Sequence, residues 1–388
     1  MTRTERENKL FRVIARQTLE RNDAAWLADN IRVGMDWPSV RERAFNEGIA
    51  PLLYYHCRHM DLLASIPGET KKFLTRIYAE ISLVNMHLMK ELEKLEKELE
   101  KRDLRVIVLK GAALLKTVYR DVALRPMEDI DLMVRQEHLN EVKNILEQMG
   151  FVQNRLYPGS FGKGILSIDI HSDFLSSDRI RSRQAILDIR SEDAWSSSIP
   201  INGSSSLYRL SLNVNLIALS FHLLKHRYDR LIWFVDIAES IKAYQSLSDW
   251  EDLIAYSRRV RADRLLLYTL ILTKRLLGGN IPEDVLIRLR KKELSSIEKY
   301  MLRLRLMHVP LGTAMDLLWM FQIRGAFKKA RFIRENIFPR QEVMNQIFPD
   351  SPRHAGMLLR RSILLSSQVL SDLLVSLKGV LRGGLPPL

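Results

Sequence analysis

Two aspartates with one residue between them are the part of this sequence best suited to chemistry. Asp129 and Asp131 flank Ile130, on a strand predicted from the apolar run Ile130 to Val134. Residues two apart on a strand point to one face, so both carboxylates should lie side by side. Such like charges repel unless a cation lies between them, and Mg²⁺ or Mn²⁺ prefers oxygen ligands of this kind. The pair predicts a divalent metal site, although it could also cap a turn or pair with Arg125.

A third carboxylate follows on another predicted strand. In the run 165–170, apolar residues alternate with polar ones, and the polar face carries Asp169 and, just beyond, His171. Three carboxylates on adjacent strands could hold two metal ions about 3.5–4 Å apart, the arrangement that stabilises attacking and leaving oxygens in phosphoryl transfer. Asp169 could instead be a solvated strand residue, and His171 a hydrogen-bonded structural histidine.

A glycine lies between the first predicted strand, 106–109, and the helix expected after it. Gly111 at this turn permits close approach of the backbone to a phosphate, and the helix N-terminus adds amide donors. Lys110 and Arg125 could add positive charge, although Lys110 could equally be a surface lysine. His222 and His226, four apart on a later predicted helix, share a face that can bind metal. No carboxylate of recognisable pattern adjoins them.

The elements that must position these residues form three parts. Residues 1–102 have helical patterning, residues 103–205 alternate strands with helices, and residues 206–388 return to helices. This order predicts an α+β fold, in which a small mixed sheet is flanked by helical regions at both ends. We expect an N-terminal helical region, a central catalytic core and a C-terminal helical, basic domain with these boundaries.

Charge is distributed unevenly along the 388 residues. The net charge is +14, and all of it lies in residues 258–388, which hold 24 Lys and Arg against 10 Asp and Glu. A basic half can bind phosphate backbones or anionic membrane surfaces, or be a set of solvated helix faces. The sequence shows no signal peptide and no stretch that predicts a transmembrane segment. The single cysteine, Cys57, excludes an intramolecular disulfide framework, so we expect a reducing, cytoplasmic setting.

Together, these motifs resemble the DNA polymerase β-like nucleotidyltransferase superfamily. Its pattern is a glycine followed by Gly or Ser, then two acidic residues two apart on a strand, then a third acidic residue on a later strand. More closely, four segments resemble the bacterial "uncharacterised nucleotidyltransferase" family over roughly residues 38–246: Leu109-Lys-Gly-Ala, Leu124-Arg-Pro-Met-Glu-Asp-Ile-Asp-Leu-Met-Val, Ile168-Asp-Ile-His, and Trp233-Phe-Val-Asp-Ile downstream of His222.

The resemblance implies an enzyme that uses Mg²⁺ or Mn²⁺ to transfer NMP from an NTP to a hydroxyl-bearing acceptor. The catalytic, metal-binding residues would be Asp129, Asp131 and Asp169. The nucleotide-binding residues would be Lys110, Gly111, Ala112, Arg125, His171 and Asp236, although a helix cap or a salt bridge is the simpler role for Asp236. Ala112 departs from the family pattern, because it lacks the serine hydroxyl that touches the phosphates.

Two other classes of function stay open at this stage. A non-catalytic protein could bind nucleotide or nucleic acid on a degenerate site, which Ala112 favours and the three carboxylates disfavour. A membrane-surface or partner-binding protein could use the basic, amphipathic helix expected near residues 353–382, but few cations lie on its polar face. The sequence does not identify the acceptor, which could be RNA, protein or a small molecule.

Overall fold

The central strands are short, apolar segments that are buried on both faces. In the computed structural model, which describes residues 1–174, 186–243, 250–279, 281–307 and 312–347, they form a seven-stranded mixed sheet with the order β3-β4-β5-β2-β1-β7-β6. The strands are β1 (Val106–Val108), β2 (Ile130–Val134), β3 (Val152–Gln153), β4 (Ser160–Lys163), β5 (Leu166–His171), β6 (Ile199–Pro200) and β7 (Leu207–Arg209). The expected α+β fold is confirmed.

Pairing directions follow from how the strands are connected. β1 and β2 are antiparallel, whereas β2 runs parallel to β5 and β1 runs parallel to β7. Parallel neighbours need long connections, which contain helices here. The helices within this part are α6 (Lys110–Thr117), η2 (Gln136–His138), α7 (Leu139–Gln148) and α8 (Ser191–Ser196).

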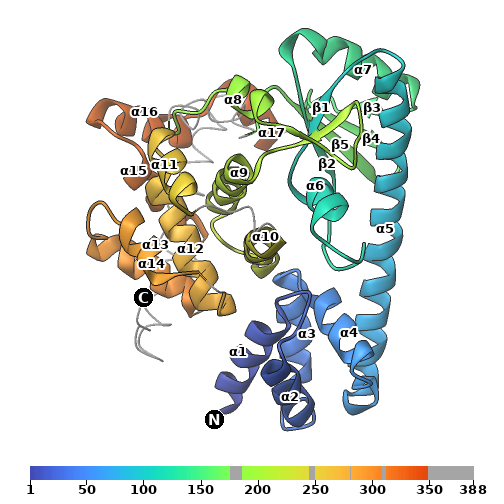
Figure 1. Ribbon diagram of the computed structural model, residues 1–388, viewed down its shortest axis with the longest axis vertical. Helices are drawn as coiled ribbons and strands as arrows, with labels where there is room; N and C mark the ends of the chain where they lie inside the picture. Colours follow the sequence, from blue (N-terminus) through green and yellow to red (C-terminus); the bar gives the residue numbers. More distant parts are fainter. Residues whose placement is uncertain (175–185, 244–249, 280, 308–311, 348–388) are drawn as a thin grey trace.

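The helices before the sheet form one end of the molecule, and the longest of them reaches the sheet. They are α1 (Arg3–Ile14), α2 (Arg21–Asn30), α3 (Trp37–Asn46), α4 (Ala50–His59), η1 (Leu63–Ser65) and α5 (Gly68–Glu100). Thr2 and Glu5 form a capping box at the start of α1, and the side chain of Asp36 caps α3. In Figure 1, α5 runs along one side of the molecule from these helices to the sheet.

The helices after the sheet gather on the other side of the molecule (Figure 1). They are α9 (Leu212–Lys225), α10 (Leu231–Ala243), α11 (Trp250–Arg259), α12 (Asp263–Leu277), α13 (Glu283–Leu289), α14 (Ser296–Leu306), η4 (Gly312–Asp316), α15 (Leu317–Gln322), α16 (Ala326–Ile337) and α17 (Gln341–Ile347). None of the helices in the described residues combines the length and the apolar character needed to cross a membrane. The helix expected near 353–382 lies outside these residues.

Two apolar clusters hold the chain together. The larger cluster combines the N-terminal helices with α9, α10 and α12, and it also takes Ile107 and Met133 from one face of the sheet. The smaller cluster joins the end of α5 and α7 to the other face, through residues such as Val108 and Leu132. Strand residues alternate between the faces, so β1 and β2 contribute to both clusters.

Three sequence expectations about the sheet need correction. The glycines between Pro158 and Gly164 favour a turn in the sequence, yet most of this segment forms β4. The strands β6 and β7 were not expected, because the short runs that form them show no alternation. Asp129 was expected on the same strand as Asp131, but β2 begins at Ile130, so Asp129 lies just before the strand.

Candidate active site

The register of two parallel strands brings Asp131 and Asp169 together. Asp131 on β2 is paired with Asp169 on β5, and Met133 with His171 two residues later. Paired residues on parallel neighbours point to the same face, so Asp131, Asp169 and His171 face one space. His171 Nε2 lies 3.0 Å from Asp131 Oδ1. The expectation that Asp169 and His171 share one strand face is confirmed on β5, whereas the face expected to be shared by Asp129 and Asp131 is not formed by β2, which begins after Asp129.

Lys110 supplies a positive charge to the same space from the turn between β1 and α6. Its Nζ donates a hydrogen bond to Asp131 Oδ1 at 2.7 Å, and its side chain is only 17% exposed. The backbone of Lys110 has φ of 50°, a left-handed conformation that costs a residue with a side chain some free energy. This strained turn directs the ammonium group at the carboxylate.

The two neighbouring aspartates of this site have opposite pKa shifts. Burial and the charge of Asp131 raise the pKa of Asp129 to about 6, and Asp169 contributes in the same direction. Burial also disfavours the charge of Asp131, but Lys110 and His171 outweigh it and lower the pKa of that carboxyl. Lys110 and Arg125 offset only part of these effects on Asp129. The site therefore holds one stabilised carboxylate and one whose negative charge is disfavoured.

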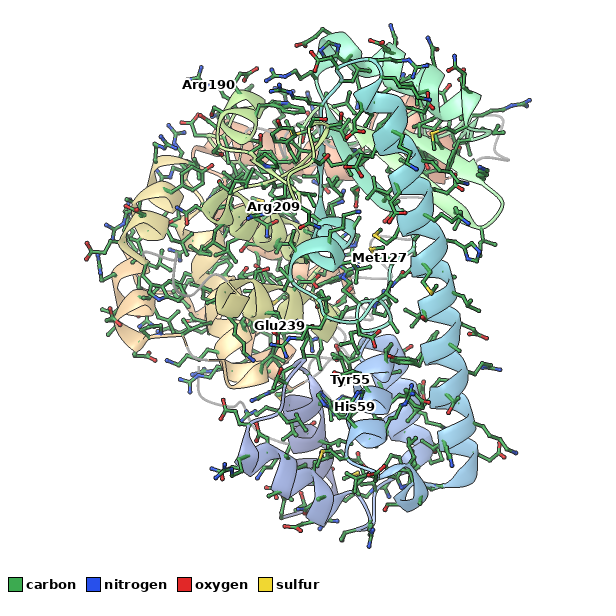
Figure 2. All side chains as sticks on the ribbon, turned by 45° about the vertical axis from the view of Figure 1, so that its right-hand side comes forward. Tyr55, His59, Met127, Arg190, Arg209 and Glu239 are labelled. Atoms are coloured by element: carbon green, nitrogen blue, oxygen red, sulfur yellow. The ribbon has the colours of Figure 1, made fainter. Side chains whose placement is uncertain are left out.

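Gly111 and Ala112 are packed against their surroundings at the start of α6. A Cβ on Gly111 would lie 2.7 Å from Met127 Sδ and 2.8 Å from Arg125 Nη1, so any larger residue would force these side chains to shift. Figure 2 shows Met127 beside α6. Ala112 is 1% exposed, and its methyl group belongs to the smaller apolar cluster. The structure thus places the backbone of this turn near the site and the Ala112 side chain in the core.

Arg125 and Asp236 form a buried ion pair next to this turn. Arg125 Nη2 donates to Asp236 Oδ2 at 2.8 Å, and Arg125 Nε donates to the same carboxylate. Tyr119 completes the cluster by donating from its hydroxyl to Asp236 Oδ1 at 2.7 Å. Burial raises the pKa of Tyr119 well above its ordinary value, so the phenol keeps the proton that it donates. The salt-bridge role expected for Asp236 is present, and it joins α10 to the loop before β2.

Sequence reasoning missed Tyr119 and Asn85, two residues that hold this loop. Asn85 on α5 is fully buried, and its Nδ2 donates to the carbonyl oxygens of Val122 and Arg125. Its signal in the sequence is a polar residue within the buried stripe of an amphipathic helix. Tyr119 had no comparable signal, because its partner Asp236 lies 117 residues later in the chain.

His222, His226 and Trp233 form an aromatic cluster between α9 and α10. The two imidazole rings are 4.5 Å apart between centroids, and each lies 5.0 Å from the Trp233 ring. Burial and the charge of Lys110 lower the pKa of His222 well below its ordinary value, so this imidazole is neutral. Within the described ranges, this cluster does not belong to a group of three metal-ligating side chains.

The residues present fit a divalent cation. Asp131, Asp169 and His171 make up the one group of three metal-ligating side chains, within the part of the chain that the structure describes, whose ligand atoms all lie within 4.8 Å of one another. Two carboxylates suit Mg²⁺ or Mn²⁺. The negative charge of Asp129, which Lys110 and Arg125 only partly compensate, is a further place for a cation to act.

Comparison with known proteins adds a family to this geometry. No curated protein and no solved structure matches the chain. One protein family, described as "Uncharacterised nucleotidyltransferase", matches residues 34–278. The match covers most of the chain and includes the candidate site with the helices that border it, from the end of the α2–α3 connection to the end of α12. The chain therefore belongs to the uncharacterised nucleotidyltransferase family.

Proposed function

We propose that this protein is a metal-dependent nucleotidyltransferase of the DNA polymerase β-like superfamily, which transfers NMP from an NTP to a hydroxyl-bearing acceptor. One observation carries the proposal. In a chain of a nucleotidyltransferase family, Asp131 and Asp169 lie in register on adjacent parallel strands, with Asp129 next to them and Lys110 within hydrogen-bond distance. Carboxylates that converge with a cationic side chain are the groups needed to bind a metal and a triphosphate.

In this proposal Asp129, Asp131 and Asp169 hold Mg²⁺ or Mn²⁺, which when bound neutralises charge on the phosphates. Asp169 accepts the proton of the acceptor hydroxyl. The acceptor oxygen then bonds to the α-phosphorus, and the bond from that phosphorus to the bridging oxygen breaks, which releases pyrophosphate. His171 orients Asp131, since its Nε2 lies against that carboxylate.

The triphosphate is held by the turn that begins α6. Lys110 provides the positive charge, and the backbone around Gly111 and Ala112 provides amide donors at a helix N-terminus. Arg125 and Asp236 support nucleotide binding indirectly, because their buried ion pair fixes the loop against which Gly111 packs.

Transfer of a labelled nucleotide tests the proposal directly. The protein is incubated with each α-³²P-labelled NTP, Mg²⁺ or Mn²⁺, and cell lysate, and acceptors are identified by label and by the mass gained. We expect label transfer by wild type and by Asp252→Asn, a change of an exposed carboxylate on α11. Asp131→Asn should abolish transfer. Equal transfer by wild type and Asp131→Asn would contradict the proposed roles.

A non-catalytic nucleotide-binding protein is the second candidate. Two observations favour it: the Lys110 ammonium already neutralises Asp131, and Ala112 offers no hydroxyl and lies in the core. The same experiment separates the two candidates. The second candidate predicts that NTP binds to the protein and is recovered intact, with no label transferred to any acceptor fraction.

A further inference from the structure

A basic cavity of about 550 Å³ lies where the ends of three helices meet. The start of α12, the residues after α13 and the end of α15 contribute to its wall. Six of the lining side chains are cationic, and Asp263 is the one carboxylate among the lining residues that the structure describes. The cations are Arg261, Arg264, Arg290, Lys291, Lys292 and Arg324. The cavity shares no residue with the candidate active site.

The cations of this cavity fall into a paired and an unpaired set. Arg264 forms an ion pair with buried Glu298, and Lys291 lies 3.8 Å from Asp263. Arg261 and Arg290 also form ion pairs, with Asp188 and Glu293 respectively. Lys292 and Arg324 are exposed and have no ion pair or hydrogen bond with any residue in the described ranges. The unpaired cations therefore remain available to an anion.

Two buried polar groups of the wall also lack partners. Gln322 is 5% exposed, and neither its amide nitrogen nor its amide oxygen has a hydrogen bond within the described part of the chain. The Nε of Arg290 is likewise buried and without a partner there. An unpaired buried donor or acceptor costs free energy, and most such groups in folded proteins are satisfied. Their position on the wall of a charged cavity points to a ligand that completes them.

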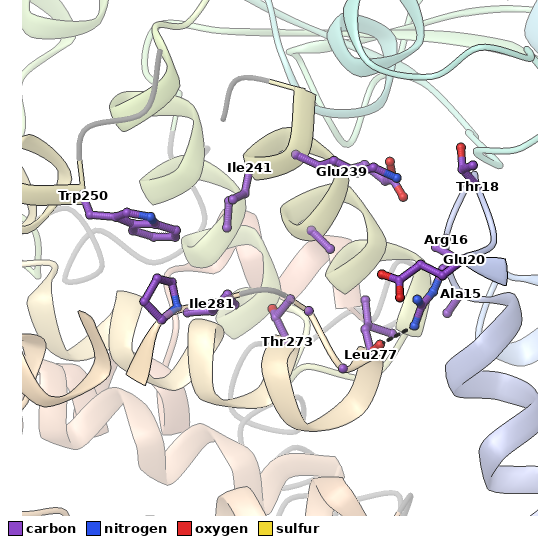
Figure 3. Close-up of a pocket in the computed structure, with 15 residues that line it drawn as sticks. Ala15, Arg16, Thr18, Glu20, Glu239, Ile241, Trp250, Thr273, Leu277 and Ile281 are labelled. Atoms are coloured by element: carbon purple, nitrogen blue, oxygen red, sulfur yellow. Dashed lines mark hydrogen bonds between the residues drawn. The ribbon is translucent and has the colours of Figure 1, made fainter. Parts of the chain in front are cut away.

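A second cavity serves as a comparison. It has a volume of about 310 Å³ and lies between the residues after α1, α10 and α12 (Figure 3). Its main charged groups are already used: Arg16 binds Asp23 and the carbonyl oxygen of Leu277, and Glu239 accepts hydrogen bonds from Gln17. Of these two cavities, and among the residues that the structure describes, the basic one combines unpaired cations with unsatisfied buried amide atoms.

We propose that the basic cavity binds a nucleoside polyphosphate at a site separate from the candidate active site. Lys292 and Arg324 bind the phosphates, as exposed cations of this kind do in many proteins. The Gln322 amide, whose polar atoms are buried in this structure, turns toward the ligand when it binds and offers both a donor and an acceptor to a base edge. Phe321, which also lines the cavity, offers a stacking surface. The volume lies within the range of small-molecule sites.

Equilibrium dialysis of labelled ATP against the full chain tests this site. EDTA is present, because the proposed active site needs a divalent metal and the basic cavity does not. We expect saturable binding at low salt. The double variant Lys292→Glu/Arg324→Glu should weaken it by about tenfold or more, a loss of roughly one charge-assisted contact. The matched control Lys328→Glu/Lys329→Glu changes the same charge on α16, outside the cavity, and should bind as wild type.

Two competitors and two further variants identify what is recognised. Inorganic tripolyphosphate should compete with ATP, and Gln322→Leu should weaken ATP more than tripolyphosphate. Asp131→Asn should bind ATP in EDTA as wild type does. The proposal is wrong if ATP does not bind, if both double variants lose affinity equally, if Asp131→Asn removes binding, or if an RNA oligonucleotide binds where ATP does not. This experiment does not measure nucleotide transfer, so its result remains valid even if the proposed enzyme function is wrong.

Discussion

At the scale of single residues, the charged form of Asp129 destabilises the folded protein, although the proposed function gives this residue a central role. Its pKa is raised to about 6 by burial and by Asp131, so the charged form is disfavoured at neutral pH. We expect Asp129→Asn to raise the free energy of unfolding by up to about 3 kcal/mol at pH 7.5 in EDTA, because the pKa rises from 3.8 to about 6 and each pKa unit corresponds to about 1.36 kcal/mol. Nucleotide transfer should fall by roughly a hundredfold or more.

Urea denaturation and the transfer assay measure the two effects of Asp129→Asn side by side. Asp252→Asn is the control, because its exposed carboxylate lies outside the site. A variant that loses stability, or one that keeps wild-type transfer, contradicts the charge balance described for Asp129.

His56 on α4 gives a second prediction at this scale. It is buried, and burial lowers its pKa to about 4, although its Nε2 donates to the Arg16 carbonyl oxygen at 2.7 Å. The unfolded chain has a histidine pKa near ~6.5, so it takes up a proton at a pH where the folded protein does not. The stability from neutral His56 is complete above pH 6.5 and lost as the pH falls toward 4.

We expect the proton uptake of His56 on unfolding to lower the free energy of unfolding by about 2 kcal/mol as the pH falls from 7.5 to 5. Urea denaturation of wild type and His56→Gln at both values measures it, because the variant lacks this proton uptake. His87→Gln, an exposed change on α5, should keep the wild-type pH dependence. If the stability of wild type and of His56→Gln depended on pH in the same way, His56 would take up its proton in the folded protein as readily as in the unfolded chain, which would contradict this prediction.

At the scale of elements, the β1–α6 turn depends on the absence of a side chain at Gly111. An alanine there would collide with Met127 and with Arg125, which Asp236 holds in place. We expect Gly111→Ala to cost about 1–3 kcal/mol of unfolding free energy, as overpacking does, and to reduce nucleotide transfer sharply. Gly162→Ala on β4 is the control, since no atom lies within 4 Å of the added Cβ. Similar stability of both variants would contradict the packing described.

The sequence predicted elements well where local signals are strong. The helix expected from Trp37 to Asn46 is α3, with Asp36 as its cap, and the strand expected over 130–134 is β2. The glycine-rich β4 was mistaken for a turn, because its pairing with β5 comes from the sheet and not from its own residues. The helix α2 was missed, since only one of its residues is fully buried and its apolar pattern is weak.

The candidate site was predictable only where its residues share a strand. The alternation around Asp169 and His171 indicated a common polar face, and the register with Asp131 is consistent with it. The pairing of Arg125 with Asp236 was not predictable as a contact, because 111 residues separate them and only tertiary packing brings them together. The catalytic roles of these residues remain predictions.

At the scale of the whole molecule, the central part depends on both helical regions. Ile107 on β1, Leu114 on α6 and Met133 on β2 belong to the larger cluster, which the N- and C-terminal helices complete. We expect residues 103–209 alone to show no cooperative unfolding transition and to bind the dye ANS, because one sheet face is uncovered. Thermal unfolding followed by circular dichroism measures this, with the full chain as control. A sharp transition for the fragment would show an independent domain.

The long helix α5 takes part in both clusters, as the short helix α6 also does. Leu74 and Ile77 of α5 are buried in the larger cluster, and Leu88, Leu92 and Leu99 in the smaller one. Its 33 residues span about 50 Å at 1.5 Å per residue. Adding one residue to its middle would turn one half by about 100° relative to the other, so one of the two buried faces would point to solvent. Over evolutionary time, we therefore expect the length of α5 to change only in steps of about seven residues, while the loops around it vary freely.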